Sequence, residues 1–190
     1  MNVYDFDYTI YAGDSTLDFY FFCLKKQPSI VIALPTQVYG AILYKLKKCT
    51  KTEFKEKFYC FLPLLKNVDK LIEEFWEKNK HKMKEFYFKQ KQPDDVIISA
   101  SPSFLLKSIC NKLEIKHLIA SQVDKLSGKY TGLNCYGEEK VKRFKELFPL
   151  TVIDNFYSDS LSDTPIAKYA NHAFLVSQNS IMNWKEDALH

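Results

Sequence analysis

Two carboxylates stand close together near the start of the chain. Asp5 and Asp7 belong to the segment Asp-Phe-Asp-Tyr-Thr at positions 5–9, which follows a short apolar run. Like charges at this spacing repel each other, and each raises the other's pKa unless a cation lies between them. Mg²⁺ accepts one or two carboxylates together with phosphate and water. The pair therefore predicts a magnesium site, although a polar turn can contain the same two residues by chance.

A hydroxyl group and an ammonium group occupy comparable positions later in the chain. Ser99 and Ala100 follow the apolar run 96–98 and lead toward a predicted helix, whose N-terminal amides can bind phosphate together with a hydroxyl. Lys140 lies one turn into another predicted helix, after Gly137. A fixed ammonium there can hold a phosphate as a point charge. Taken singly, Ser99 could also be a helix N-cap, and Lys140 could be an ordinary lysine on the protein surface.

A second acidic pair follows the apolar run 151–157. Asp159 comes directly after this run, and Asp163 begins the next predicted helix. Capping of that helix explains Asp163 well but explains Asp159 poorly. All four groups of polar residues thus stand at strand ends or at the helix starts beside them.

Alternating strands and helices predict how these residues are positioned. The predicted strands cover residues 2–5, 96–98, 117–123, 151–157 and 173–176, and helical patterns cover 103–113, 138–148 and 162–169. A turn-rich piece at 126–132 predicts a small β-hairpin. The alternation predicts an α/β fold with a parallel sheet and helices on both faces. The carboxyl ends of parallel strands share one edge, where open sheets of this kind bind ligands.

The chain between the first two strands has a different character. Residues 16–92 are rich in Lys, Glu, Phe, Tyr and Leu at helical spacing, and they predict three or four helices. We therefore expect a core domain from residues 1–12 and 92–190, with a helical cap from residues 13–91 inserted after the first strand. The apolar stretch 29–46 is interrupted by Pro35 and Gly40 and predicts a packed helical hairpin, not a membrane span. The lysines between positions 45 and 57 are interpreted as a solvated face.

Composition narrows the class of protein. The 190 residues have a formal net charge of +4, which suits an anionic substrate but not a nucleic-acid binder. The five cysteines are widely spaced without a C-x-x-C pair, which indicates reduced thiols and a cytoplasmic location. No signal peptide is evident at the N-terminus. Nothing in the sequence indicates an oligomeric state.

Taken together, these four groups of residues resemble the motifs of the haloacid dehalogenase-like (HAD) superfamily. The segment 5–9 matches its D-x-D-x-T motif, Ser99 its second motif, Lys140 its third, and Asp159 with Asp163 its fourth. The helical insert and the stretch 128–140 resemble the phosphoserine phosphatase-like branch, subfamily IB. This resemblance implies a Rossmann-like three-layer core with a parallel sheet, plus a helical cap.

The resemblance also implies a mechanism. Asp5 would attack phosphorus and form an aspartyl-phosphate, and Asp7 would act as general acid and base. Mg²⁺ would be bound by Asp5, the backbone carbonyl of Asp7 and Asp159, with Asp163 orienting this shell or Lys140. Ser99, the amide of Ala100 and Lys140 would hold the phosphoryl oxygens. The implied activity is magnesium-dependent hydrolysis of a small phosphate monoester.

Two departures from the family pattern leave the substrate open. Tyr8 stands where the family usually has glycine, and Ser158, Ser160 and Ser162 replace residues of the phosphoserine phosphatase motif. A phosphotransferase or mutase would use the same aspartyl-phosphate. A regulator that binds phosphate or metal would have the same fold but no catalytic activity. A peripheral membrane enzyme acting on a lipid phosphate would use the aromatic, lysine-rich cap.

Overall fold

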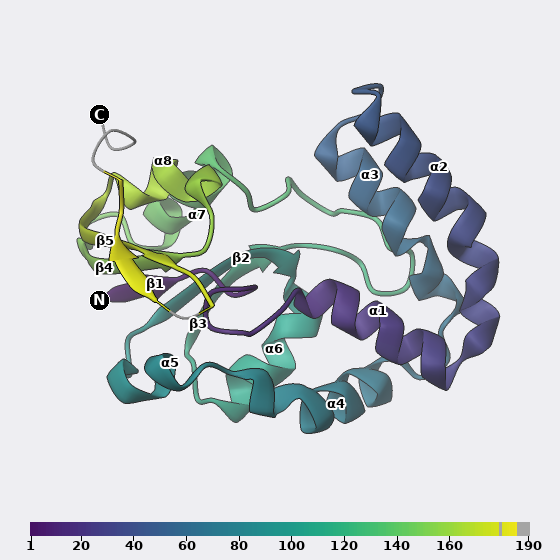
Figure 1. Cartoon of the computed structure of the whole chain (residues 1–190), viewed down its shortest axis with the longest axis horizontal. Helices are drawn as coiled ribbons and strands as arrows, with labels where there is room; N and C mark the ends of the chain where they lie inside the picture. Colours follow the sequence, from purple (N-terminus) through teal and green to yellow (C-terminus); the bar gives the residue numbers. More distant parts are fainter. Residues whose placement is uncertain (179, 186–190) are drawn as a thin grey trace.

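A six-stranded sheet forms the centre of the molecule. The computed structural model describes residues 1–178 and 180–185 (Figure 1). The sheet order is β3-β2-β1-β4-β5-β6, parallel except for the antiparallel last pair. The strands are β1 (Asn2–Tyr4), β2 (Val96–Pro102), β3 (His117–Ser121), β4 (Ile153–Ser158), β5 (Ala170–Val176) and β6 (Ile181–Asn183). The predicted α/β fold with a parallel sheet is confirmed, and the antiparallel strand β6 was not predicted.

Both faces of the sheet are apolar because successive side chains of a strand point to opposite sides. Val3, Val96 and Phe156 belong to one buried cluster, which also contains residues of α7 and α8. Their chain neighbours Tyr4, Ile97 and Tyr157 belong to a second cluster, on the side of α4 and α6. Strands that are buried on both faces explain the continuous apolar runs of the sequence.

Three helices of the predicted core flank the sheet. They are α6 (Ser103–Lys112), α7 (Glu138–Leu147) and α8 (Thr164–Ala167), the last preceded by the 3-10 helix η4 (Leu161–Asp163). In Figure 1, α6 lies below the sheet and α7 and α8 lie above it, which gives three layers. The helix α7 begins directly after Gly137, whose φ of 58° lies in the left-handed region that glycine tolerates. This start places Lys140 in the first turn.

The long insert between β1 and β2 is helical. It contains α1 (Ser15–Lys26), α2 (Leu34–Lys45), α3 (Lys51–Phe58), α4 (Val68–Asn79) and α5 (Glu85–Gln90), with the 3-10 helices η1 (Pro28–Ala33), η2 (Tyr59–Leu64) and η3 (Lys80–Lys82) between them. Asp14 caps α1 by accepting a hydrogen bond from the amide of Leu17 at 2.9 Å. Thr50 and Glu53 form a capping box at the start of α3.

The insert has two parts with different surroundings. In Figure 1, α1, α2 and α3 project to the right of the sheet, whereas α4 and α5 lie below it beside α6. Trp76 of α4 is fully buried, and its indole N–H donates to the carbonyl of Leu105 in α6 at 2.7 Å. Its ring also contacts Phe6 and Tyr11 edge-on. The division into a core of 1–12 and 92–190 and a cap of 13–91 stays a prediction.

Two local predictions differ from the structure. The expected β-hairpin at 126–132 is reduced to one antiparallel bridge, between Val123 and Tyr130. The apolar stretch 29–46 does form η1 and α2, but most of its side chains are exposed instead of packed. Within the described part of the chain, no helix has both the length and the apolar character that crossing a bilayer requires.

Candidate active site

Asp5 lies at the carboxyl end of the central strand. It follows β1 directly, and its amide donates to the carbonyl of Tyr157 in β4 at 2.9 Å. The chain passes from β1 to β2 and β3 on one side, and then to β4 and β5 on the other. Asp5 therefore stands where the strand order reverses, which is the usual ligand site of open α/β sheets.

Lys140 joins two buried carboxylates. Its ammonium lies 2.7 Å from Oδ1 of Asp5 and 2.7 Å from Oδ2 of Asp163, and only 2 % of its side chain is exposed. Burial alone would lower the pKa of Lys140, but attraction to these two carboxylates outweighs it and raises the pKa. Burial raises the pKa of Asp5 against the opposing attraction of Lys140. The ammonium is thus fixed in place beside the Asp5 carboxylate.

Asp7 is held from two directions. Its Oδ1 accepts from the amide of Ser15 at the start of α1 at 2.7 Å, and its Oδ2 accepts from the hydroxyl of Ser101 on β2. The hydroxyls of Ser101 and Thr16 lie 3.1 Å apart, which extends the network into the insert. Burial raises the pKa of Asp7, while the hydrogen bonds from Ser101 and Ser15 oppose this. A carboxyl group with a raised pKa can carry a proton near neutral pH.

The second predicted motif lies on the strand beside Asp5. Ser99 is buried on β2, and its hydroxyl accepts from the amide of Ser101 at 3.1 Å. The pairing of β2 with β3 shifts register between Ser99 and Pro102. Such a bulge at the end of a strand redirects the side chains near a site. The carbonyl of Ala100 accepts from Lys55 of α3 at 2.8 Å, so a helix of the insert contacts this motif directly.

The fourth motif is anchored to the first. The amide of Asp159 donates to the hydroxyl of Thr9 at 2.9 Å, and Thr9 is fully buried. The hydroxyl of Ser158 donates to Asp163 at 2.7 Å, on the same oxygen that contacts Lys140. Burial raises the pKa of Asp159, and the neighbouring Asp163 adds to this effect. The two aspartates have different surroundings: Asp163 is buried against Lys140, whereas Asp159 has no ion pair with it among the described residues.

All seven predicted site residues line one cavity of about 350 Å³. They are Asp5, Asp7, Ser99, Ala100, Lys140, Asp159 and Asp163. The insert contributes the opposite wall through Leu17, Phe54, Phe58, Tyr59, Lys51 and Lys55. The structure therefore brings together every residue that the motifs singled out and covers them with the helices of the insert.

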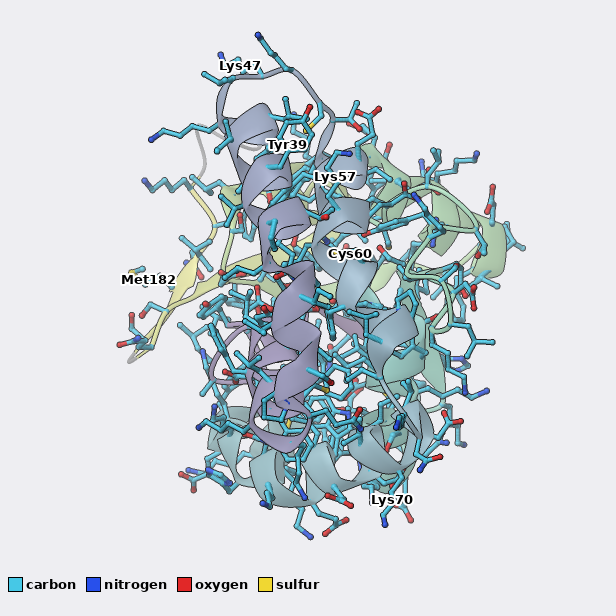
Figure 2. The ribbon with its side chains drawn as sticks, turned by 90° about the vertical axis from the view of Figure 1, so that its right-hand side faces the viewer. Tyr39, Lys47, Lys57, Cys60, Lys70 and Met182 are labelled. Carbon is cyan, nitrogen blue, oxygen red and sulfur yellow. The ribbon has the colours of Figure 1, made fainter. Side chains whose placement is uncertain are left out.

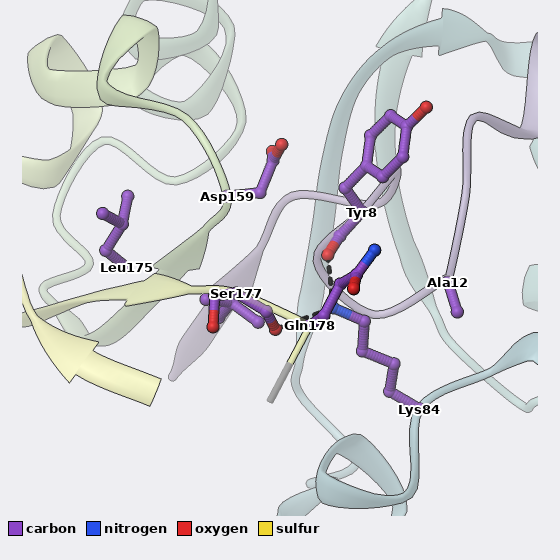
Figure 3. Close-up of a pocket in the computed structure, with 8 residues that line it drawn as sticks. Tyr8, Ala12, Lys84, Asp159, Leu175, Ser177 and Gln178 are labelled. Carbon is purple, nitrogen blue, oxygen red and sulfur yellow. Dashed lines mark hydrogen bonds between the residues drawn. The ribbon is translucent and has the colours of Figure 1, made fainter. Parts of the chain in front are cut away.

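A neighbouring cavity of about 480 Å³ is lined by Tyr8, Lys84 and Asp159, among other residues (Figure 3). Tyr8 and Asp159 line both cavities, but Asp5 and Lys140 line only the first. Lys84 donates to the carbonyl of Tyr8 and, at 3.3 Å, to the carbonyl of Ser177 after β5 (Figure 3). Tyr8 has a φ of 57°, in the left-handed region. These contacts hold the loop although a bulky residue replaces the usual glycine.

The oxygen donors of the first cavity fit a magnesium ion. Among residues 1–178 and 180–185, no group of three or more His, Cys, Asp or Glu side chains could hold a metal. The predicted set needs only two such side chains, Asp5 and Asp159, since its third ligand is the backbone carbonyl of Asp7. All of these donors are oxygen, which is the ligand type that Mg²⁺ prefers, and both carboxylates line the same cavity.

Three residues of the site were missed from the sequence. Lys55 was interpreted as part of a solvated face, but it is half-buried and lines the cavity. Loss of solvent, together with the like charge of Lys51, lowers the pKa of Lys55 to about 8. Ser101 and Thr16 support Asp7. The spacing Ser99-x-Ser101 at a strand end is a signal for Ser101, whereas Thr16 and Lys55 have none because the fold of the insert brings them here.

Comparison with known proteins adds a family and a relative. A family model described as haloacid dehalogenase-like hydrolase matches residues 3–168. A protein of Mycobacterium tuberculosis named probable phosphatase is 35 % identical over 92 residues, which are 44 % of this chain and 32 % of that protein. The match thus spans about a third of the length of that relative.

Solved structures share the fold at low identity. A Bordetella pertussis protein of unknown function superposes with a TM-score of 0.71 at 19 % identity, covering 91 % of this chain and 87 % of that one. A phosphoserine phosphohydrolase-like protein of Francisella tularensis superposes with a TM-score of 0.55 at 17 % identity, covering 91 % and 86 %. At this identity the two structures support the fold alone.

Proposed function

The chain belongs to the haloacid dehalogenase-like hydrolase family, and we propose that it is a magnesium-dependent phosphatase that hydrolyses a small phosphate monoester through a phosphorylated Asp5. The observation that carries this proposal is the cluster at the end of β1. Asp5 lines the cavity beside a buried ammonium that is held at 2.7 Å from both Asp5 and Asp163. The name of the mycobacterial relative, probable phosphatase, supports the same activity.

In the first step, a carboxylate oxygen of Asp5 forms a bond to phosphorus while the bond from phosphorus to the leaving oxygen breaks. Asp7 gives its proton to that oxygen, so that the product leaves as a neutral alcohol. The raised pKa of Asp7 suits this donation, and the hydrogen bonds from Ser15 and Ser101 fix its carboxyl group. In the second step, Asp7 accepts a proton from the water that attacks the phosphorylated Asp5 and releases inorganic phosphate.

The phosphoryl oxygens need fixed positive or donor groups because their negative charge persists through the transition state. Lys140, the hydroxyl of Ser99 and the amide of Ala100 line the cavity around Asp5 and supply such groups. Asp163 keeps Lys140 in place, since it accepts a second hydrogen bond from the ammonium that contacts Asp5. We assign Asp163 to this positioning role.

Asp5, Asp159 and the backbone carbonyl of Asp7 would hold Mg²⁺. When bound, the cation neutralises the phosphoryl charge and lets a dianion approach several carboxylates. The cavity is lined by five carboxyl groups and three ammonium groups, so the carboxylates outnumber the ammonium groups even when Asp7 carries a proton. The carboxylates are Asp5, Asp7, Asp14, Asp159 and Asp163, and the ammonium groups are Lys51, Lys55 and Lys140.

The helices of the insert would cover the bound substrate. Leu17 from α1 and Phe54 and Phe58 from α3 line the cavity opposite the carboxylates. A cover of this kind keeps bulk water from the site and selects the leaving group. We therefore assign the choice of substrate to α1 and α3 and the phosphoryl chemistry to the sheet edge.

A panel of phosphate monoesters, assayed with Mg²⁺ and with EDTA, tests this proposal. We expect inorganic phosphate to be released with Mg²⁺ and not with EDTA. Transfer of phosphate to an added alcohol, without release in its absence, would indicate a phosphotransferase instead. A folded protein that binds Mg²⁺ but turns over no member of the panel would contradict the proposal and favour a binding role.

A further inference from the structure

A segment of the insert is apolar and basic without any acidic residue. Between Phe19 and Thr52 the chain has six lysines and no Asp or Glu, although both kinds of charge are nearly equal in number over the whole chain. Three of these lysines, Lys45, Lys47 and Lys48, stand at the C-terminal end of α2. In the part of the chain that the structure describes, none of these three takes part in an ion pair.

The helix α2 presents a second apolar side that nothing in the described chain covers. Only Gln37 and Gly40 of α2 are buried, with Ala33 just before it, along the stripe that faces α3. The side away from α3, continued by the preceding η1, carries large apolar residues that are 46–73 % exposed, namely Val31, Ile32, Leu34, Val38, Tyr39, Ile42 and Leu46. Their spacing of three, four and seven residues places most of them on one side of the helix. Together with Lys45, Lys47 and Lys48, they form what we name the hairpin face.

Figure 2 shows this face toward the viewer. Tyr39 lies along α2, Lys47 lies at the far end of that helix, and Lys57 lies on the neighbouring α3. Gly40 allows α2 and α3 to pack closely, because a Cβ at this position would lie 2.7 Å from Cβ of Lys57. The two helices therefore support each other, and the hairpin face is a preformed surface. A large exposed apolar surface rimmed by charges usually marks a binding site.

We propose that the hairpin face docks the protein onto an anionic lipid surface. Exposed lysines that form no ion pair attract anionic headgroups, and aliphatic and tyrosine side chains enter the boundary between headgroups and acyl chains. The same positive charge would repel an identical face of a second copy across a two-fold interface. With 12 residues, α2 falls well short of the roughly 20 that span a bilayer, so it lies in the plane of the surface. This inference does not depend on the proposed phosphatase activity.

Sedimentation with lipid vesicles, without substrate, tests the inference. The full chain is mixed with vesicles of phosphatidylcholine alone and with vesicles that also contain phosphatidylglycerol. We expect binding to the anionic vesicles only, weakened by high salt because exposed charges are screened. The triple variant Lys45→Glu, Lys47→Glu, Lys48→Glu should lower the partition coefficient by about tenfold or more, as should the double variant Ile32→Asp, Ile42→Asp.

Matched control variants test whether binding depends on the hairpin face itself or on net charge and exposed apolar residues anywhere on the protein. Lys107, Lys116 and Lys142 are exposed elsewhere, and their replacement by Glu makes the same change in net charge. Leu147 and Leu150 are likewise exposed elsewhere, and their replacement by Asp matches the apolar double variant. Both controls should bind as the wild type does. The inference is overturned if the wild type ignores anionic vesicles, if the controls lose binding equally, or if light scattering shows a dimer that only the Ile32→Asp, Ile42→Asp variant dissociates.

Discussion

At the scale of single residues, the fixed ammonium of Lys140 is central to the site. Replacing it with Met leaves Asp5 and Asp163 buried without their shared cation. Removal of one partner from a buried ion pair costs about 3–5 kcal/mol, so we expect a loss of this size in the free energy of unfolding. Urea unfolding of the metal-free protein at neutral pH measures it. Lys142→Met, on the exposed side of the same helix, should change stability by less than about 0.5 kcal/mol; equal stability of the two variants would contradict the account.

Asp95 should make stability depend on pH. Burial raises its pKa to about 6, while the hydrogen bond from the amide of Gln92 opposes this. A carboxyl group whose pKa is higher in the folded state binds protons more tightly there, so stability falls as pH rises from about 4 to about 6. The wild type should therefore lose about 2 kcal/mol of its free energy of unfolding between pH 4 and pH 7 that the Asp95→Asn variant does not lose.

Two controls isolate the effect of Asp95: the measurement is made on metal-free protein, and a variant of an exposed aspartate is measured beside it. EDTA keeps the contribution of the site carboxylates equal in both chains. Asp69→Asn, which removes an exposed carboxylate, should follow the pH dependence of the wild type. A wild type and an Asp95→Asn variant that lose stability in parallel between pH 4 and pH 7 would show that Asp95 does not cause the loss.

Individual site residues could be predicted only where a motif records them. Asp5, Asp7 and Asp159 stand at fixed spacings beside apolar runs, so their positions at the sheet edge follow from the sequence. Lys55 reaches the same cavity from α3, and its position depends on how the helices of the insert fold back over the sheet. No local pattern encodes that folding, because a lysine on a helix looks the same whether it faces solvent or a cavity.

At the scale of elements, Gly128 connects the loop after β3 to the insert. Its φ is 72°, and a Cβ there would lie 2.5 Å from the carbonyl oxygen of Tyr59 in η2. Gly128→Ala combines backbone strain with this clash, so the free energy of unfolding should fall by at least about 2 kcal/mol. Thermal unfolding measures the effect.

Gly132 in the same loop is the matched control. A Cβ at Gly132 would meet nothing closer than the guanidinium of Arg143 at 3.8 Å. Gly132→Ala should therefore unfold at nearly the same temperature as the wild type. Similar losses in both variants would mean that the contact between Gly128 and η2 does not hold the loop.

The elements that were predicted are those with strong local patterns. The strand β2 begins with a continuous apolar run because both of its faces are buried, and α6 and α7 follow a clear helical spacing. The strand β6 escaped prediction because it lies at the sheet edge with every residue exposed, and so lacks a buried run. The hairpin prediction at 126–132 rested on turn residues alone, and these also suit the loop that is found.

At the scale of the whole molecule, the excess of carboxylates in the cavity makes stability depend on a bound cation. Mg²⁺ that binds only the folded state raises the free energy of unfolding by about 2.7 kcal/mol at a concentration one hundred times its Kd. For a chain of this length, that increase corresponds to a rise in Tm of about 5 °C or more. Calorimetry with Mg²⁺, against NaCl of equal ionic strength, measures this rise. Asp159→Asn should reduce it, and no rise in the wild type would contradict the proposed metal site.

The exposure of the hairpin face could not be predicted from the sequence. The apolar stretch 29–46 was expected to be packed because apolar helices usually are. Whether such a helix is covered depends on the elements that surround it, and α2 packs mainly against α3 and the neighbouring 3-10 helices, with a hydrogen bond from Tyr20 of α1 to Gln37. The sequence predicted the helix but not its exposure.

The central claim, that Asp5 is the nucleophile, is tested most directly by one comparison. Phosphate release from p-nitrophenyl phosphate with Mg²⁺ is measured for the wild type, for Asp5→Asn and for Asp94→Asn, which changes an exposed aspartate. We predict that Asp5→Asn loses activity by at least about 10³-fold, since the amide cannot form the covalent intermediate, while Asp94→Asn stays close to the wild type. If Asp5→Asn released phosphate within about tenfold of the wild-type rate, Asp5 would not be the nucleophile.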